Sequence, residues 1–224
     1  DHAIRHRSPS RGLGDVYKRQ HDANDGGANR LYRNDIELGG DWRFVDVTKD
    51  VGLDVHNRRH SLAAAWEDFD NDGDSDLYVA NDYGLNCLYR NDVSTGGGFT
   101  EIAAEANITD RGSGMSVSWG DYNRDGYIDL YVANMFSSAG HRITGQSQFL
   151  AHVDQGVRKA YRRFAKGNTL FQGQGDGTFR EMPDAAVELG RWAWSSLFVD
   201  LNNDTWQDLV VANGFISAPD TQDL

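Results

Sequence analysis

The chain of 224 residues contains one cysteine, three prolines and no run of eighteen apolar residues. Cys87 therefore has no partner for a disulfide within the chain and is interpreted as a small apolar residue of a strand. Because a transmembrane helix needs about twenty apolar residues, no membrane span is predicted. Acidic residues outnumber basic ones by 34 to 22, for a formal net charge of -12. This imbalance argues against nucleic-acid binding and favours cation binding or simple solubility.

Glycine is frequent at 25 residues, which suits many tight turns, and a hydrophobic content of 39% is enough for a core. The first twenty residues differ from the rest, with five basic and two acidic side chains. Their segment GLGDVYKRQ resembles translated library-adapter sequence. Residues 1–20 are therefore interpreted as non-native and are left out of the fold prediction.

An internal repeat organises residues 21–224. An acidic element occurs as WEDFDNDGDSDLYVAND (66–82), WGDYNRDGYIDLYVANM (119–135) and FVDLNNDTWQDLVVANG (198–214), and a second element as NRLYRND (29–35), NCLYRND (86–92) and NTLFQGQ (168–174). Successive copies are 57, 53 and 79 residues apart, so the period is about 55 with an insertion in the third unit. The predicted units are 21–67, 68–120, 121–199 and 200–224.

Each unit contains short β-prone stretches between Gly, Asn and Asp turns. Several strands per unit predict an all-β fold of β-propeller blades, about three to four in number. The insertion near 140–166 is expected to form one amphipathic helix with a basic face, either packed on the rim or used to bind a partner. Its apolar residues at helical spacing are Phe149, Val153, Val157, Tyr161 and Phe164, and its basic residues are Arg158, Lys159, Arg162, Arg163 and Lys166.

The first unit is incomplete. Subtracting the spacing of 57 residues from Asp68 leads to Arg11, so the expected aspartate loop is missing there. The repeat resumes at Ala23, which is equivalent to Ala80. We therefore expect the native sequence to begin near His21 and the chain to be an internal fragment of a longer protein.

Three aspartate-rich loops, the first of which is DFDNDGDSD (68–76), carry oxygen donors at the same four positions. Positions 1, 3, 5 and 9 are Asp68, Asp70, Asp72 and Asp76 in the first loop, Asp121, Asn123, Asp125 and Asp129 in the second, and Asp200, Asn202, Asp204 and Asp208 in the third. Position 7, held by Asp74, Tyr127 and Trp206, is expected to offer a backbone carbonyl. Carboxylates about 4 Å apart repel by roughly 4 kcal/mol near a protein surface, so a counter-ion is expected. Alternating oxygen ligands fit Ca²⁺ better than Mg²⁺, and the sequence predicts about three structural calcium sites.

The loops differ from those of EF-hand proteins. A valine (Val79, Val132 or Val211) stands at position 12 in place of glutamate, and no helices flank the loops, so each loop is expected to join two strands. A single Asp-rich loop is more often a turn that binds nothing, whereas three loops in register favour a ligand set. Thr205 replaces glycine at position 6, where a left-handed backbone is expected, so the third site is predicted to be looser or to use another turn.

These repeats resemble the FG-GAP or VCBS repeat proteins, whose repeats build β-propellers. Four segments also look like the bacterial relatives of cartilage acidic protein, which often carry an ASPIC/UnbV domain after the repeats; that domain is not among these residues. The segments are GRWAWSSLFVDLNND (190–204), LVVANGFI (209–216), MFSSAGHRI (135–143) and AKGNTLF (165–171). The resemblance implies calcium in each loop and an extracellular, surface-associated or periplasmic protein.

Three functions remain open from the sequence. The leading one is a calcium-binding propeller module for extracellular binding or adhesion, with an unknown protein or carbohydrate ligand and no chemistry of its own. The alternative is the scaffold of a polysaccharide lyase or hydrolase, which would need convergent basic and aromatic side chains. Candidates for that role are Arg58, Arg59, His60, Arg191 and Trp192, although ordinary turn residues and aromatic packing within the blades are the favoured explanation of them. A structural spacer in a larger surface protein is the third.

No nucleophile elbow, phosphate loop, paired-cysteine zinc site or HExxH motif occurs, so no catalytic residue is predicted. Trp66, Trp119 and Trp194 are interpreted as core residues of the blades.

Overall fold

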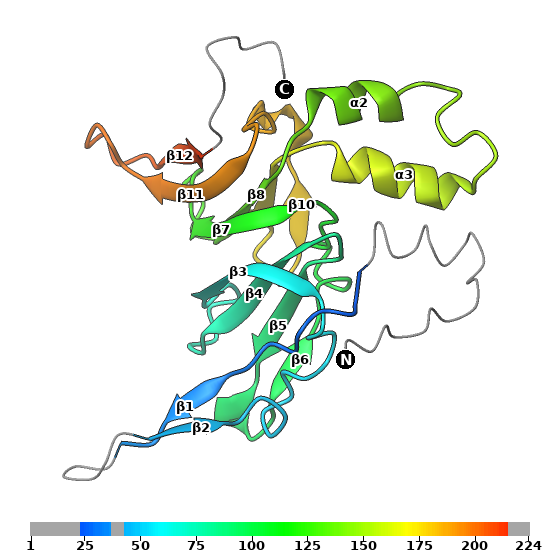
Figure 1. Cartoon of the computed structure of the whole chain (residues 1–224). Coiled ribbons are helices and arrows are strands. Elements are labelled where there is room, and N and C mark those ends of the chain that lie inside the picture. The colour runs from blue at the N-terminus through cyan, green and yellow to red at the C-terminus, as the bar shows by residue number, and fades with distance from the viewer. Residues whose placement is uncertain (1–22, 37–42, 215–224) are drawn as a thin grey trace, which may run out of the picture.

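The computed structural model describes residues 23–36 and 43–214, which form four antiparallel sheets and two helices (Figure 1). The first sheet contains β1 (Tyr32–Asn34) and β2 (Phe44–Asp46), and the last contains β11 (Ala193–Val199) and β12 (Asp208–Asn213). Between them are two four-stranded sheets, β3 (His60–Glu67), β4 (Asp76–Asp82), β5 (Cys87–Asn91) and β6 (Phe99–Glu101), then β7 (Gly114–Gly120), β8 (Asp129–Asn134), β9 (Thr169–Gly173) and β10 (Phe179–Glu181). Short 3-10 helices follow β5 at Val93–Thr95 and β10 at Pro183–Ala185.

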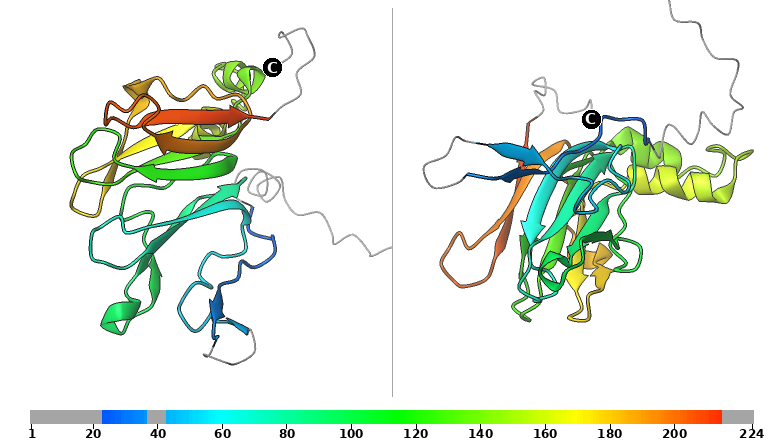
Figure 2. Two further views of the ribbon diagram at one scale, coloured as in Figure 1. Left: turned by 90° about the vertical axis from the view of Figure 1, so that its left-hand side faces the viewer. Right: turned by 90° about the horizontal axis from the view of Figure 1, so that it is seen from below.

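Both four-stranded sheets have consecutive strands side by side, and their strands pair in the same register. Leu77 of β4 is opposite Tyr89 of β5, and Leu130 of β8 is opposite Phe171 of β9. The first strands β3, β7 and β11 contact one another in turn, so the sheets stand as a row (Figures 1 and 2). This arrangement confirms the predicted all-β class of propeller-like blades.

The main core lies between the two complete blades. Tyr78 of β4 meets Trp119 of β7 edge to face, with 6.0 Å between ring centroids. The Trp119 indole Nε1 donates to Ala65 O of β3 at 3.4 Å. Phe69 and Phe179 pack beside them at 5.7 Å. Aromatic side chains of one blade thus bury their surface against the next, which orders the row of sheets.

The tryptophan prediction is correct for Trp119 and wrong for the other two residues. Phe198, two residues before the third loop, takes the place of Trp119 and packs on Tyr131 at 6.4 Å. Trp194 lies at the bulge where the β11–β12 register shifts, and its side chain is 47% exposed. Trp66 lines a cavity between β3 and residues 29–31, and its side chain is 46% exposed.

The insertion contains two helices, so the prediction of one helix is wrong. Helix α2 spans Ser138–Thr144 and α3 spans Gln155–Phe164, and both lie on one side of the sheets (Figure 1). Asp154 starts α3, because its carboxylate accepts from the Gly156 amide at 2.7 Å. Phe149 and Val153 therefore lie in the connection between the helices rather than on a shared helical face.

The basic residues of the insertion have two environments: Lys159 and Arg162 are exposed, whereas Arg163 at the end of α3 and Lys166 just after it are partly buried in ion pairs. Arg163 donates to Asp110 at 2.9 Å and to Glu181 at 2.5 Å, and the Asp110 side chain is 1% exposed. Lys166 pairs with the same Glu181. Arg162 donates to Thr144 O of α2 at 3.1 Å. These side chains attach α3 to the second complete blade and to α2.

Cys87 is buried in β5, as predicted. Residues 1–20, interpreted as non-native, lie outside the described residues. Among the described residues, no helix is long and apolar enough to cross a membrane.

Candidate metal centre

Each aspartate loop joins the first and second strands of a sheet, as predicted. In the first loop, between β3 and β4, Asp68 accepts from the backbone amides of Asp72 and Gly73, both at 3.0 Å. Asn71 and Gly73 have left-handed backbones, with φ of 60° and 92°. The tight turn therefore folds around the carboxylate at position 1, and aspartate satisfies amides that would otherwise lack partners.

The other two loops have the same construction. Asp121 accepts from Asp125 and Gly126 at 3.1 and 3.0 Å, and Asp200 accepts from Asp204 and Thr205 at 3.1 and 2.8 Å. Position 6 is left-handed in all three loops, including Thr205 with φ of 74°. The third loop therefore uses the same turn, and a β-branched residue occupies a conformation that usually needs glycine.

Position 4 is left-handed as well, which sequence reasoning missed. Its residues are Asn71, Arg124 and Asn203, with φ between 58° and 60°. Asparagine tolerates this conformation, so Asn71 and Asn203 were a usable sequence indication, whereas Arg124 was not.

Position 9 is a buried carboxylate in the complete blades. Asp76 is fully buried and accepts from Phe69 N at 3.3 Å and Asn91 N at 2.8 Å. Asp129 accepts from Tyr122 N at 3.1 Å and Gly173 N at 2.9 Å. Each side chain thus links its own loop to the third strand of the sheet. Burial raises the pKa of both carboxyls to about 7, despite these hydrogen bonds.

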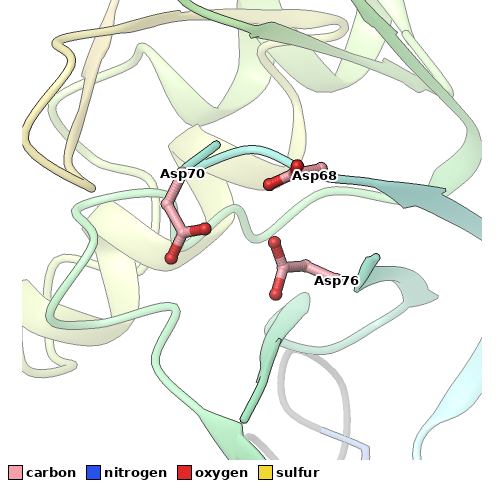
Figure 3. Close-up of side chains that lie close together, drawn as sticks. All are labelled: Asp68, Asp70 and Asp76. Carbon is pink, nitrogen blue, oxygen red and sulfur yellow. The ribbon is translucent and has the colours of Figure 1, made fainter. Parts of the chain in front are cut away.

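In the first loop three carboxylates meet. One oxygen from each of Asp68, Asp70 and Asp76 lies within 4.8 Å of the others, and the side chains point toward one another (Figure 3). Asp70 Oδ1 is buried without a hydrogen-bond partner in the described part of the chain. Burial, followed by the negative charge of Asp72, raises the pKa of Asp70. The group is an all-oxygen donor set with an unsatisfied buried acceptor, which suits a hard cation.

Asp72 and Asp74 lie outside this three-carboxylate group. Asp72 accepts from Asp74 N at 2.9 Å, and the Asp74 carboxylate accepts from the Ser94 hydroxyl. At position 7 the equivalent amides of Tyr127 and Trp206 likewise donate to position 5, at 2.9 and 2.8 Å.

The second and third loops have asparagine at position 3. The Asn123 amide donates to Asp125 at 2.8 Å, and the Asn202 amide donates to Asp204 at 2.9 Å. A hydrogen bond therefore replaces the carboxylate pair that Asp70 forms with its neighbours. The hydrogen bond from the Trp206 amide, followed by that from Asn202, lowers the pKa of Asp204. The second and third loops therefore carry less negative charge than the first loop.

Two of the residues proposed for the enzyme alternative, His60 and Trp192, have different surroundings. His60 Nε2 is 3.4 Å from Asp25 Oδ1, at the start of β3. Trp192 forms a β-bridge with Met135 and lies 6.4 Å from Trp194, measured between ring centroids. Trp192 also lines a cavity of about 670 Å³ beside α3, together with Tyr83, Tyr161 and Phe164. Five of its eleven lining residues are aromatic.

Comparison with known families agrees with the geometry of the repeats. Residues 68–132 and 160–211 match the model of the FG-GAP-like repeat. The chain belongs to the FG-GAP-like repeat family. The first match begins at Asp68 and contains the first two aspartate loops, and the second match contains the third loop. No curated protein matches the chain significantly.

Proposed function

We propose that this FG-GAP repeat chain is a calcium-binding propeller module used for extracellular binding or adhesion, without chemistry of its own. The calcium proposal rests on the close approach of the Asp68, Asp70 and Asp76 carboxylates, one of whose buried oxygens accepts no hydrogen bond from the described residues. A cation among them would offset their mutual repulsion and the burial of their charge.

Calcium suits these loops better than other common cations. Every candidate donor is an oxygen, which disfavours zinc and copper, and the irregular spacing fits the flexible coordination of Ca²⁺ rather than the strict octahedron of Mg²⁺. We propose about three sites, with the first loop binding most tightly. Asn123 and Asn202 replace a carboxylate in the other two loops, so those sites are expected to be weaker.

Bound calcium would act through stability. The ion would join the strands on either side of a loop, and Asp76 would extend that link to β5 through the Asn91 amide. A ligand at a hundredfold excess over its Kd adds about 2.7 kcal/mol to the free energy of unfolding.

The test compares two isosteric variants in the first loop. Asp70→Asn removes a carboxylate from the three-carboxylate group, whereas Asp74→Asn changes a carboxylate that bonds Ser94 outside it. Calcium should raise the Tm of the wild-type chain, and calorimetry should show that Asp70→Asn weakens or loses one site while Asp74→Asn keeps it. A Tm that is the same in calcium and in chelator would sink the calcium proposal.

The binding role has a candidate location in the cavity beside α3. Its walls of Tyr83, Tyr161, Phe164 and Trp192 suit the apolar face of a sugar ring or an apolar peptide side chain. Proteins with FG-GAP repeats are commonly extracellular, which fits such a ligand. Trp192→Ala should abolish binding of oligosaccharides or peptides found to quench tryptophan fluorescence, with Trp66→Ala, a residue that does not line this cavity, as the control.

The finer kinship with bacterial relatives of cartilage acidic protein is also a proposal. It rests on the segments GRWAWSSLFVDLNND, LVVANGFI, MFSSAGHRI and AKGNTLF. A longer reading frame that encodes an ASPIC/UnbV domain after the repeats would support it, and one that encodes an unrelated domain would count against it.

A further inference from the structure

Two residues of the aspartate loops have side chains that do not suit their backbone conformation. Position 4 is left-handed in every loop, and the first and third loops have asparagine there, which tolerates this conformation. The second loop has Arg124 instead, with φ of 58°. Position 6 is also left-handed, and it is glycine in the first two loops but Thr205, with φ of 74°, in the third. The turn therefore explains the residue type at neither Arg124 nor Thr205.

These two residues contact each other across adjacent blades. Nη1 of Arg124 donates to Oγ1 of Thr205 at 2.6 Å, and the Arg124 Cζ lies 5.3 Å from the centroid of the Trp206 ring. Glycine at position 6 has no hydroxyl to accept this hydrogen bond, and asparagine at position 4 has no cation to place over the ring. One contact between the second and third loops thus accounts for both departures from the repeat.

The contact reaches candidate ligands in both loops. In the second loop Arg124 stands in sequence between Asn123 and Asp125, the oxygen donors at positions 3 and 5, which are joined by a hydrogen bond of 2.8 Å. In the third loop the backbone amides of Thr205 and Trp206 hold the carboxylates at positions 1 and 5, each at 2.8 Å. An ion that fixes the donors of one loop therefore constrains the residues that position the donors of the other.

The first loop has no such link to the second. Both loops lie in the described part of the chain, and there no hydrogen bond, ion pair or ring contact joins residues 68–76 to residues 121–129. The Asp74 carboxylate of the first loop accepts instead from the Ser94 hydroxyl of its own sheet. The first loop therefore provides a comparison within the same chain.

We propose that Arg124 couples calcium binding in the second and third loops, so that an ion in either loop raises the affinity of the other. This inference rests on the proposed calcium role of the loops. An ion in the second loop would fix the donors on either side of Arg124 and thereby order its side chain, so the third loop would already be held when its own ion binds. Coupling between two sites is reciprocal, so an ion in the third loop would assist the second equally. Arg124 is thus a positioning residue and not a ligand.

A calcium titration followed by two-dimensional NMR tests this coupling in the 224-residue chain, because the amide at position 6 of each loop reports its own ion. Asp208→Asn weakens the third site, and its amide oxygen can still accept from Leu201 N as the carboxylate does. The calcium concentration at which the Gly126 amide is half shifted should then rise at least about fivefold. Asp70→Asn, the matched change in the first loop, should leave this midpoint unchanged.

Arg124→Asn separates the coupling from the affinity of each site. Asparagine suits the left-handed backbone, and the change removes the contact with Thr205 together with a charge that repels both ions, so the individual affinities change as well. In this background Asp208→Asn should no longer displace the Gly126 midpoint. A displacement that is the same with and without Arg124→Asn, or none in either background, would overturn the coupling and leave calcium binding intact. Failure of every loop amide to respond to calcium would overturn the proposed function and the coupling with it.

The reverse experiment keeps the question decidable if Asp208→Asn does not fold. Asp125→Asn weakens the second site, and the Thr205 amide then reports the third. Its midpoint should rise by a similar factor, because the coupling is reciprocal. Circular dichroism verifies that each variant folds. An unchanged Thr205 midpoint would refute Arg124 as the link between the two loops.

Discussion

Arg124 of the second loop lies over the ring of Trp206 in the third, with its Cζ 5.3 Å from the ring centroid. Its guanidinium also donates to Thr205 Oγ1 at 2.6 Å. These residues belong to adjacent blades, and they come from positions 4, 6 and 7 of the aspartate loops. The two loops are therefore joined directly, outside the aromatic core.

Loss of this connection should weaken the third loop selectively. Arg124→Ala removes a cation-π contact and a hydrogen bond at the surface, together worth about 1 kcal/mol. We expect a lower free energy of unfolding by that amount and faster amide hydrogen exchange in residues 200–208. Arg90→Ala, which removes a local ion pair with Asp92 in another sheet, is the control and should leave exchange in this loop unchanged.

Replacing Thr205 should increase the stability of the protein, because its left-handed backbone is unfavourable for a β-branched side chain. In the Arg124→Ala background, where the Thr205 hydroxyl has already lost its donor, Thr205→Asn should stabilise the protein by roughly 0.5 to 1 kcal/mol, since asparagine tolerates this conformation. Gly73→Thr, at the same position of the first loop, should destabilise it by a similar amount. An added Cβ at Gly73 meets nothing within 4 Å, so the change tests the backbone alone. Urea unfolding measures both, and equal effects of one sign would contradict the explanation.

Removing only the arginine of the Arg163–Asp110 ion pair should lower the free energy of unfolding substantially. Arg163→Met leaves the Asp110 carboxylate, which is 1% exposed, without its cationic partner and should cost roughly 3 kcal/mol. Lys159→Met, on the same helix, is the control and should change stability by less than about 0.5 kcal/mol. Chemical denaturation measures both losses of stability. Equal small losses would show that Arg163 does not anchor the helix.

Stability without metal should fall as the pH rises from about 4 to about 7. Asp76 and Asp129 have pKa values of about 7 in the folded chain, above the ordinary value of 3.8, so the folded state holds these protons more tightly than the unfolded state. Asp76→Asn should reduce this slope, because the amide stays neutral throughout. Urea unfolding in chelator at pH 5 and pH 8 measures the difference between the variant and the wild type. A steeper slope in Asp76→Asn would be inconsistent with burial as the cause.

Much of the architecture could be predicted from the repeated residues. The three copies of DLYVAN or DLVVAN indicated the second strands, and the loops before them were correctly expected to join two strands. The single helix was wrong, because Asp154 begins a new helix after a connection that apolar spacing alone does not reveal. Trp194 was assigned to the core by residue type, whereas the alignment of the repeat puts Phe198 at that position.

The sequence predicted which residues belong to the candidate site but not how their side chains are arranged in space. Spacing placed oxygen donors at positions 1, 3, 5 and 9. The structure brings Asp68, Asp70 and Asp76 together, and it leaves Asp72 outside the group with its carboxylate accepting from the Asp74 amide. Which carboxylates converge depends on the conformation of the turn, which spacing does not specify.

The sequence by itself determined the strand units, the tight turns and the charge of the loops, because strand propensity, left-handed turn residues and side-chain chemistry act over a few neighbours. Only the tertiary structure decided which equivalent residues are buried. Tyr78 and Tyr131 are covered by an outer strand and by the next blade, whereas Val210 in almost the same local sequence is exposed. Burial depends on what packs against a strand, and the residues that supply that packing are remote in sequence.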